Sequence, residues 1–197
     1  MRTEGENMDS ARKSFHQALD EIRQEMVVMA AMVTEGIPRA TEVMLSGDMA
    51  EAQAIIDGDD PLDAKAVELE EVGVLQGARL QPIAGDLRSI VTALRMIGEI
   101  ERSGDLVVNI AKGSRRIFGT ELPARLRGLI GQMGEEATRL FRLSLDAYID
   151  EDAGVAAALD DLDDRLDSIH REYIQEIFVV HNAGDLGIQP AVQLALV

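Results

Sequence analysis

The sequence contains no cysteine and no tryptophan, and it has only two tyrosines and four phenylalanines in 197 residues. The absence of cysteine excludes disulfide bonds and thiolate metal sites, and it is compatible with a reducing cytoplasm. Aromatic residues are scarce while Ala, Leu, Ile, Glu, Asp and Arg are plentiful, which favours helical bundles over sandwiches or barrels. We therefore expect an all-α protein.

Positive charge is also scarce, because 19 Lys and Arg stand against 36 Asp and Glu, for a formal net charge of −17. This balance argues against a nucleic-acid-binding protein, which needs a basic surface to neutralise phosphates. The compact basic cluster of the chain consists of Lys112, Arg115 and Arg116, with Arg125 and Arg127 nearby. One explanation is that cations are favoured at a helix C-terminus by its dipole. The other is a docking patch for a partner.

Long apolar runs and catalytic motifs are missing as well. The longest apolar run, residues 26–33, is too short to span a bilayer, and residues 1–10 lack the apolar segment of a secretory signal. The sequence has no phosphate-binding glycine loop, no nucleophile elbow and no paired zinc ligands. We therefore expect a soluble, cytoplasmic protein that is not an enzyme and that reaches a membrane only through partners.

Caps, prolines and hydrophobic periodicity predict six helical segments. Asp48 and either Asp150 or Asp152 are good N-caps, and proline is favourable in a first helical turn, as at Pro82 and Pro123. The predicted segments span residues 10–46, 48–76, 82–118, 123–148, 152–181 and 190–197.

The two halves of the chain resemble each other. Residues 46–63 match the residues 104 positions further on, at 150–167. Such self-similarity indicates a tandem repeat, and we expect two antiparallel three-helix bundles, one formed by residues 1–118 and one by residues 119–197. The second repeat stops early, so we expect its last helix, the sixth, to be truncated at the C-terminus. The matching acidic residues are Asp48 with Asp152, Asp59 with Asp163, and Asp63 with Asp167.

A carboxylate interrupts the apolar seam of the third predicted helix. Apolar residues recur at helical spacing from Ile83 through Ile97 and again at Val108, but position 101 is Glu, and Asp105 follows one turn later. A carboxylate on an apolar seam is costly unless something neutralises it.

A second acidic pair lies on the preceding predicted helix, where Asp59 and Asp63 are also one turn apart. If the two helices form an antiparallel hairpin that turns at Pro82, Asp63 comes level with Glu101, because each lies 19 residues from the turn, and Asp59 comes level with Asp105. Four carboxylates brought together in this way would repel one another. Three outcomes relieve this repulsion: some carboxylates are protonated, the helices turn them toward water, or hard cations that prefer oxygen ligands bind. In the second half the pair recurs as Asp163 and Asp167, without its partner pair.

The residues of these motifs resemble the PhoU family, which regulates bacterial phosphate uptake and the phosphate-starvation response. The resemblance is carried by residues 81–112, QPIAGDLRSIVTALRMIGEIERSGDLVVNIAK, and by the acidic D-x-x-x-D pairs that begin at Asp59 and Asp163. It covers essentially the whole chain. The chain departs from the family pattern at Ser103 and Leu106, where the family usually has Ile and His, and at Pro61 inside the first acidic pair.

The resemblance implies an all-helical protein of two three-helix bundles that acts as a negative regulator. It implies two partners, the ATPase subunit of a phosphate ABC transporter and a phosphate-sensing histidine kinase, and a homodimer or higher oligomer. It also implies bound divalent or trivalent metal ions, with Fe, Zn, Mg and Mn not distinguished. The implied metal ligands are Asp59, Asp63, Glu101, Asp105, Asn109, Asp163 and Asp167.

Two alternatives remain open at this stage. The same carboxylates suit a metal-storage or metal-sensing helical protein, which would bind many ions per chain and respond to metal rather than to phosphate. They also suit a purely structural homo-oligomeric bundle in which the acids point to solvent.

Overall fold

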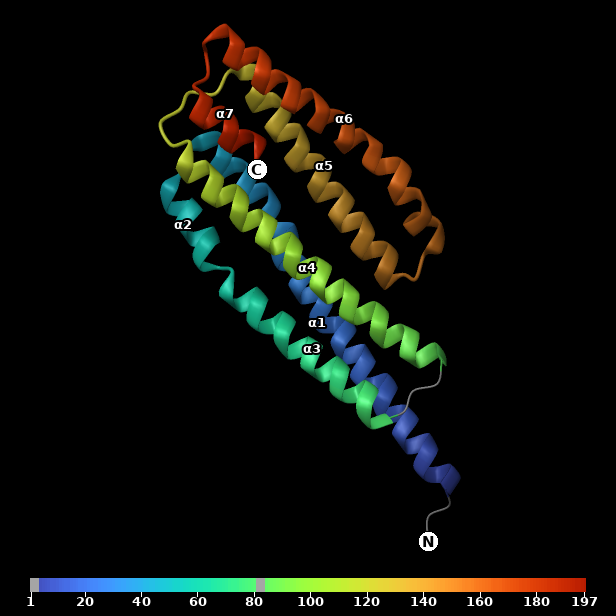
Figure 1. The fold of residues 1–197 in the computed structure, drawn as a ribbon. Helices are drawn as coiled ribbons and strands as arrows, with labels where there is room; N and C mark the ends of the chain where they lie inside the picture. Colours follow the sequence, from blue (N-terminus) through green and yellow to red (C-terminus); the bar gives the residue numbers. More distant parts are fainter. Residues whose placement is uncertain (1–3, 81–83) are drawn as a thin grey trace. The chain divides into compact units, whose positions relative to one another are not determined.

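A computed structural model describes residues 4–80 and 84–197, and these residues form seven α-helices and no β-strand (Figure 1). The all-α fold expected from composition is confirmed. The helices are α1 (Glu4–Ser46), α2 (Met49–Asp57), α3 (Asp60–Leu80), α4 (Ala84–Arg116), α5 (Ala124–Ile149), α6 (Ala153–Ala183) and α7 (Ile188–Ala195).

Helix starts follow the capping signals of the sequence. Asp48 caps α2, since its Oδ1 accepts hydrogen bonds from the backbone amides two and three residues on, each at 3.0 Å. Asp152 caps α6 in the same way, with distances of 2.8 and 3.0 Å. Pro123 immediately precedes α5, so these three predictions are confirmed. Pro82, the predicted start of the third segment, lies outside the described residues.

The second predicted segment, 48–76, is wrong as a single helix, because the chain breaks between α2 and α3. The backbone amide of Gly58 bonds to the carbonyls of Ala54 and Ile55 and ends α2. Pro61 has no amide hydrogen with which to continue an α-helix from the preceding turn, but its fixed φ suits a first turn. A new helix therefore begins at Asp60, and Asp59 lies in the break.

The helices pack into two compact units, each of which combines segments that are far apart in the sequence. These packing units do not test the boundary between sequence repeats at residue 118, which stays a prediction. Unit 1 comprises Met1–Met32 and Asp60–Ser103, and unit 2 comprises Val33–Asp59 and Gly104–Val197. None of the helices in the described residues carries an apolar stretch long enough to cross a lipid bilayer.

Unit 1 is a bundle of the N-terminal part of α1, α3 and the first part of α4. Lys65 on α3 pairs with Glu25 on α1, and His16 on α1 lies 3.4 Å from a carboxylate oxygen of Asp86 on α4. Gly73 on α3 packs closely against α4, because a Cβ there would lie 2.8 Å from a terminal methyl group of Leu94, which would have to move. The buried core includes Phe15, Leu19, Ile22, Met26, Met29, Leu62, Leu69, Ile90 and Ile97.

Unit 2 contains the end of α1, α2, the end of α4, and α5 to α7. Tyr173 on α6 donates its hydroxyl hydrogen to the carbonyl of Leu194 on α7 at 2.8 Å, and burial raises the pKa of this phenol. On α5, a Cβ at Gly134 would overlap Thr41 of α1. The core cluster of unit 2 is Met44, Ile117, Leu122, Leu126, Leu129, Ile130, Ile169, Tyr173, Ile177, Val180, Leu186, Ala191 and Leu194.

Candidate functional site

The seam of α4 is buried around Glu101, as the sequence predicts. Ile97 is 0% exposed and Val108 is 3% exposed, whereas Glu101 between them is half-buried. Asp105 and Asn109, which follow Glu101 at one-turn intervals, are exposed. Of these three candidate ligands, Glu101 alone lies within the packed side of the helix.

The first acidic pair does not lie on one helical face. Asp59 is half-buried in the break before α3, and Asp63 is exposed on α3 itself. The expected spacing of one turn on a continuous helix is therefore wrong for this pair. Gly58 and Pro61 are the physical reason, because together they end one helix and begin the next.

The second acidic pair keeps the predicted geometry. Asp163 and Asp167 lie one turn apart on the uninterrupted helix α6, and both side chains are exposed. They therefore share one side of α6, in contact with solvent.

Metal binding through oxygen requires several donors that converge on one point. In residues 13–78 and 85–197, whose side chains the structure describes, no group of three or more Asp, Glu or His side chains is placed so that it could hold a metal ion. These residues thus supply donors of suitable chemistry without gathering them at one point. The seven-residue ligand set stays a prediction.

A buried carboxylate that the sequence reasoning missed lies on α5. Glu136 is 5% exposed, and Arg139 of the same helix donates a hydrogen bond to its Oε1 from Nε at 3.1 Å. Arg165 of α6 approaches the other carboxylate oxygen at 3.8 Å. The hydrogen bond from Arg139 holds the pKa of Glu136 below its ordinary range, although burial alone would raise it. The missed signal is that Glu136 interrupts an apolar seam, as Glu101 does.

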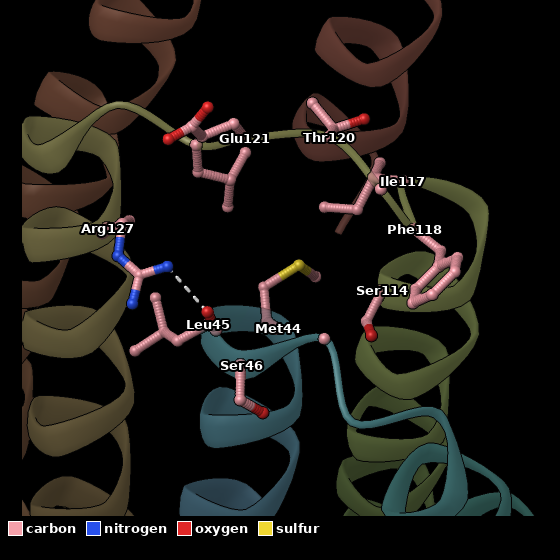
Figure 2. Close-up of a pocket in the computed structure, with 12 residues that line it drawn as sticks. Met44, Leu45, Ser46, Ser114, Ile117, Phe118, Thr120, Glu121 and Arg127 are labelled. Carbon is pink, nitrogen blue, oxygen red and sulfur yellow. Dashed lines mark hydrogen bonds between the residues drawn. The ribbon is translucent and has the colours of Figure 1, made fainter.

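A pocket of about 330 Å³ opens in unit 2 where the end of α1 meets the end of α4 and the loop before α5 (Figure 2). Met44 of α1 and Ile117 point into its centre, and Leu122 is the third buried apolar residue of the lining. Three hydroxyl residues add polar groups to the lining, and they are Ser46, Ser114 and Thr120. The charged residues Glu121 and Arg127 also line the pocket, so an apolar floor meets largely polar walls.

The backbone around this pocket is shaped by two tight turns and one arginine. Gly47, with φ of 71°, and Gly119, with φ of 80°, adopt left-handed conformations that favour glycine. Arg127 of α5 donates a hydrogen bond from Nη1 to the carbonyl of Leu45 at 2.7 Å (Figure 2). This bond satisfies one of the carbonyls that the last turn of α1 leaves without a helical partner.

A smaller pocket of about 160 Å³ lies elsewhere in unit 2, between α1, α5 and α6. Its lining is mostly apolar and includes Ile37, Ile130 and Met133, with His170 and Tyr173 from α6. His170, which follows Asp167 on α6, thus borders a pocket. Among the described residues, the ionisable side chains that line this pocket are His170 and Tyr173. These two groups alone do not indicate a catalytic or metal site.

Comparison with known sequences points to one family. A family model of the PhoU domain matches residues 26–113. The chain is 30% identical over 161 residues to the phosphate-specific transport system accessory protein PhoU homolog 2 of Mycobacterium tuberculosis, covering 81% of this chain and 76% of the relative. It is 32% identical over 167 residues to the PhoU homolog of Clostridium acetobutylicum, covering 84% of this chain and 76% of the relative.

Solved structures agree on the fold. The crystal structure of PhoU from Pseudomonas aeruginosa is similar, with a TM-score of 0.86 at 22% identity, covering 92% of this chain and 87% of that one. The phosphate transport system regulatory protein PhoU from Streptococcus pneumoniae gives a TM-score of 0.81, also at 22% identity, covering 92% of this chain and 84% of that one.

Proposed function

Because the chain belongs to the PhoU family, we propose that it is an accessory regulator of a phosphate-specific transport system. The observation that supports this proposal is the extent of the match. Relatives that bear the name of phosphate-specific transport system accessory proteins align with 81% and 94% of this chain. A match of this extent covers both predicted repeats, so the proposal concerns the whole chain rather than one helix pair.

We propose further that the chain is a negative regulator, which acts as an adaptor between the ATPase subunit of the transporter and a phosphate-sensing histidine kinase. Helical bundles suit this role, since their packed helices present preformed faces that change little on binding. The role requires docking and no catalytic step by this chain. A homo-oligomer, cytoplasmic placement and access to the membrane through the transporter belong to the same proposal.

The regulatory role is tested by deleting the gene and measuring phosphate uptake and a phosphate-starvation reporter in high phosphate. Loss of a negative regulator should raise both, and the parent gene supplied in trans should restore repression. Reporter activity that stays repressed in the deletion strain would contradict the role. For the adaptor part, purified ATPase subunit and kinase should each be retained on the immobilised chain, and retention of neither would contradict it.

Metal binding by the predicted ligands is a separate part of the proposal. It is supported by the half-buried position of Glu101 on the seam of α4 and by the preference of hard cations for carboxylate oxygen. A cation that binds only the folded chain raises its melting temperature. The chelator EDTA should therefore lower that temperature, and the double substitution Glu101→Gln, Asp105→Asn should lower both the metal content and the melting temperature of the protein.

The matched control is Glu70→Gln, Glu71→Gln, which removes the same charge from exposed positions on α3. Elemental analysis of the purified proteins gives the metal content. A Glu101, Asp105 variant that carries as much metal as the parent would refute the ligand assignment. Many ions per parent chain would instead favour the metal-storage alternative.

A further inference from the structure

One end of unit 2 carries positive charge in a strongly acidic protein. Between residues 112 and 127 the chain has five basic residues and a single acidic one, Glu121, although its formal net charge is −17. All five basic side chains are exposed. The basic residues, here named the basic patch, are Lys112, Arg115 and Arg116 at the end of α4, with Arg125 and Arg127 at the start of α5.

The helix dipole explains only part of the basic patch. Arg115 and Arg116 lie in the last turn of α4, where the dipole favours cations. Arg125 and Arg127 lie in the first turn of α5, where the same dipole disfavours them, and that turn contains no acidic residue. A purely local role in helix stability therefore does not account for the patch as a whole.

The contacts of the patch leave most of its charge uncompensated. Among the residues whose side chains the structure describes, Arg125 alone of the patch faces a carboxylate, that of Glu176 at 2.9 Å. Within the described residues, the other arginines donate to neutral oxygens and have no carboxylate within 4 Å. Their partners are Gln53 Oε1 for Arg115 at 2.8 Å, Gln193 Oε1 for Arg116 at 3.3 Å, and the carbonyl of Leu45 for Arg127 at 2.7 Å.

Apolar surface adjoins this charge. Arg127 lines the pocket of about 330 Å³ together with Glu121, the one acidic residue of this stretch, and Phe118 at the pocket is 68% exposed (Figure 2). The contact between Arg116 and Gln193 places α7 beside the patch. Helix α7 carries no charged residue, and its Ile188 and Val192 are 61% and 45% exposed. A pocket with an apolar floor beside exposed arginines is complementary to an apolar side chain flanked by acids.

We infer that this end of unit 2 docks an acidic, amphipathic segment of a protein partner, with one apolar side chain of that segment in the pocket lined by Met44, Ile117 and Leu122. The inference concerns the chemistry of the surface and goes beyond the proposed function, since it does not depend on which protein carries the segment.

A protein segment fits this surface better than a membrane or a nucleic acid does. An extended polyanion such as a nucleic acid or an anionic membrane would be repelled by the acidic remainder of the chain. A short acidic segment would interact only with charges within a screening length of about 8 Å at physiological salt. The pocket is a discrete hollow suited to one side chain. The chain also has few aromatic residues on which bases would stack.

The test uses a fluorescein-labelled helical peptide with Glu on one face and Leu on the other, and it measures fluorescence anisotropy against the full chain. The parent should bind the peptide, and binding should weaken as salt is raised. Arg115→Glu, Arg116→Glu should lower the affinity by at least about tenfold, because both charges reverse at the contact. Neither arginine is buried, so this variant keeps its fold, as circular dichroism melting will verify.

The matched control is Arg88→Glu, Arg95→Glu, which reverses two exposed charges earlier on α4. Position 95 is roughly 30 Å along α4 from Arg115 at 1.5 Å per residue, so the control should bind like the parent. Four results would overturn the inference. They are no binding by the parent, equal binding by the Arg115, Arg116 variant, equal binding of a peptide with Ser in place of Leu, and arginine-dependent binding to phosphatidylglycerol vesicles.

Discussion

Asp59 and Asp63 lie on either side of a helix start, whereas Asp163 and Asp167 lie one turn apart on the continuous helix α6. The two pairs have the same spacing in sequence and follow equivalent N-caps, Asp48 and Asp152. Their backbones nevertheless differ. Equal spacing of acids in two repeats therefore does not guarantee that the acids present equal sets of oxygen donors.

Two positions account for the difference. Where the first repeat has Gly58 and Pro61, the second has Leu162 and Arg165 at the matching places. Leucine and arginine continue a helix, and Arg165 also reaches the buried Glu136 of α5. The position that helps to start a helix in the first repeat thus forms an ion pair in the second repeat.

The largest effect is expected from Arg165→Pro, which gives α6 the proline of the first repeat. Proline inside a helix removes a hydrogen bond and clashes with the preceding turn, so the free energy of unfolding should fall by about 3 kcal/mol or more. Urea denaturation measures this loss. The control Arg165→Ala removes only a long ion pair whose arginine is exposed, and it should cost less than about 1 kcal/mol. Equal losses in the two variants would mean that removal of the charge, and not disruption of α6, lowers the free energy of unfolding.

A smaller effect is expected from Glu136→Gln, which removes a charge that the first repeat lacks. Hydrogen bonds to a charged group contribute about 2 kcal/mol, so the free energy of unfolding should fall by about that amount at pH 7. The folded pKa of Glu136 lies below its ordinary value of 4.5. Its stabilising effect is therefore present above pH 4.5 and is lost as pH falls through the folded pKa.

The measurement is urea denaturation of parent and Glu136→Gln at several pH values, and the difference between them should shrink below pH 4.5. Met32, the matching residue of the first repeat, provides the control. Met32→Leu should change stability by an amount that does not vary with pH. A difference for Glu136→Gln that is constant down to pH 2 would contradict the ion pair.

Replacing either N-cap residue should lower the free energy of unfolding by the same moderate amount. Asp48→Ala and Asp152→Ala each remove a side chain that accepts two backbone hydrogen bonds, and each should lower the free energy of unfolding by about 1 kcal/mol. Asparagine at either position should restore most of the loss. A clearly larger loss at one cap would show that the repeats differ there as well.

The smallest effect is expected from Pro61→Ala. Pro61 is exposed in the first turn of α3, so its loss removes no buried contact and only relaxes the unfolded chain, at a cost of about 0.5 kcal/mol. The urea midpoint should barely move. A loss as large as that of Arg165→Pro would contradict the difference between the repeats described above.

The helical fold and most helix starts were predictable because they depend on local signals. Asp48, Pro123 and Asp152 act through hydrogen bonds and dihedral angles within a few residues. The break at Gly58 and Pro61 was visible in the sequence, but the repetition of the acidic spacing favoured a continuous helix. The seam around Glu101 was predictable from periodicity, and the same periodicity marks Glu136.

The basic patch could be identified in the sequence but not interpreted there. Whether an arginine faces a carboxylate or a neutral oxygen depends on residues far along the chain, such as Gln193 for Arg116. The pocket beside it likewise depends on how the ends of α1 and α4 meet within unit 2. Periodicity and capping carry no information about such contacts.

The hydroxyl of Tyr173 provides an optical probe of the attachment of α7. The chain has no tryptophan, so its near-ultraviolet absorption comes chiefly from two phenols, Tyr148 and Tyr173. Tyr173 is the buried one, and its hydroxyl bonds to the backbone of α7. Detachment of this short helix would expose that phenol to water and shift its spectrum, which allows the opening of α7 to be followed without any added label.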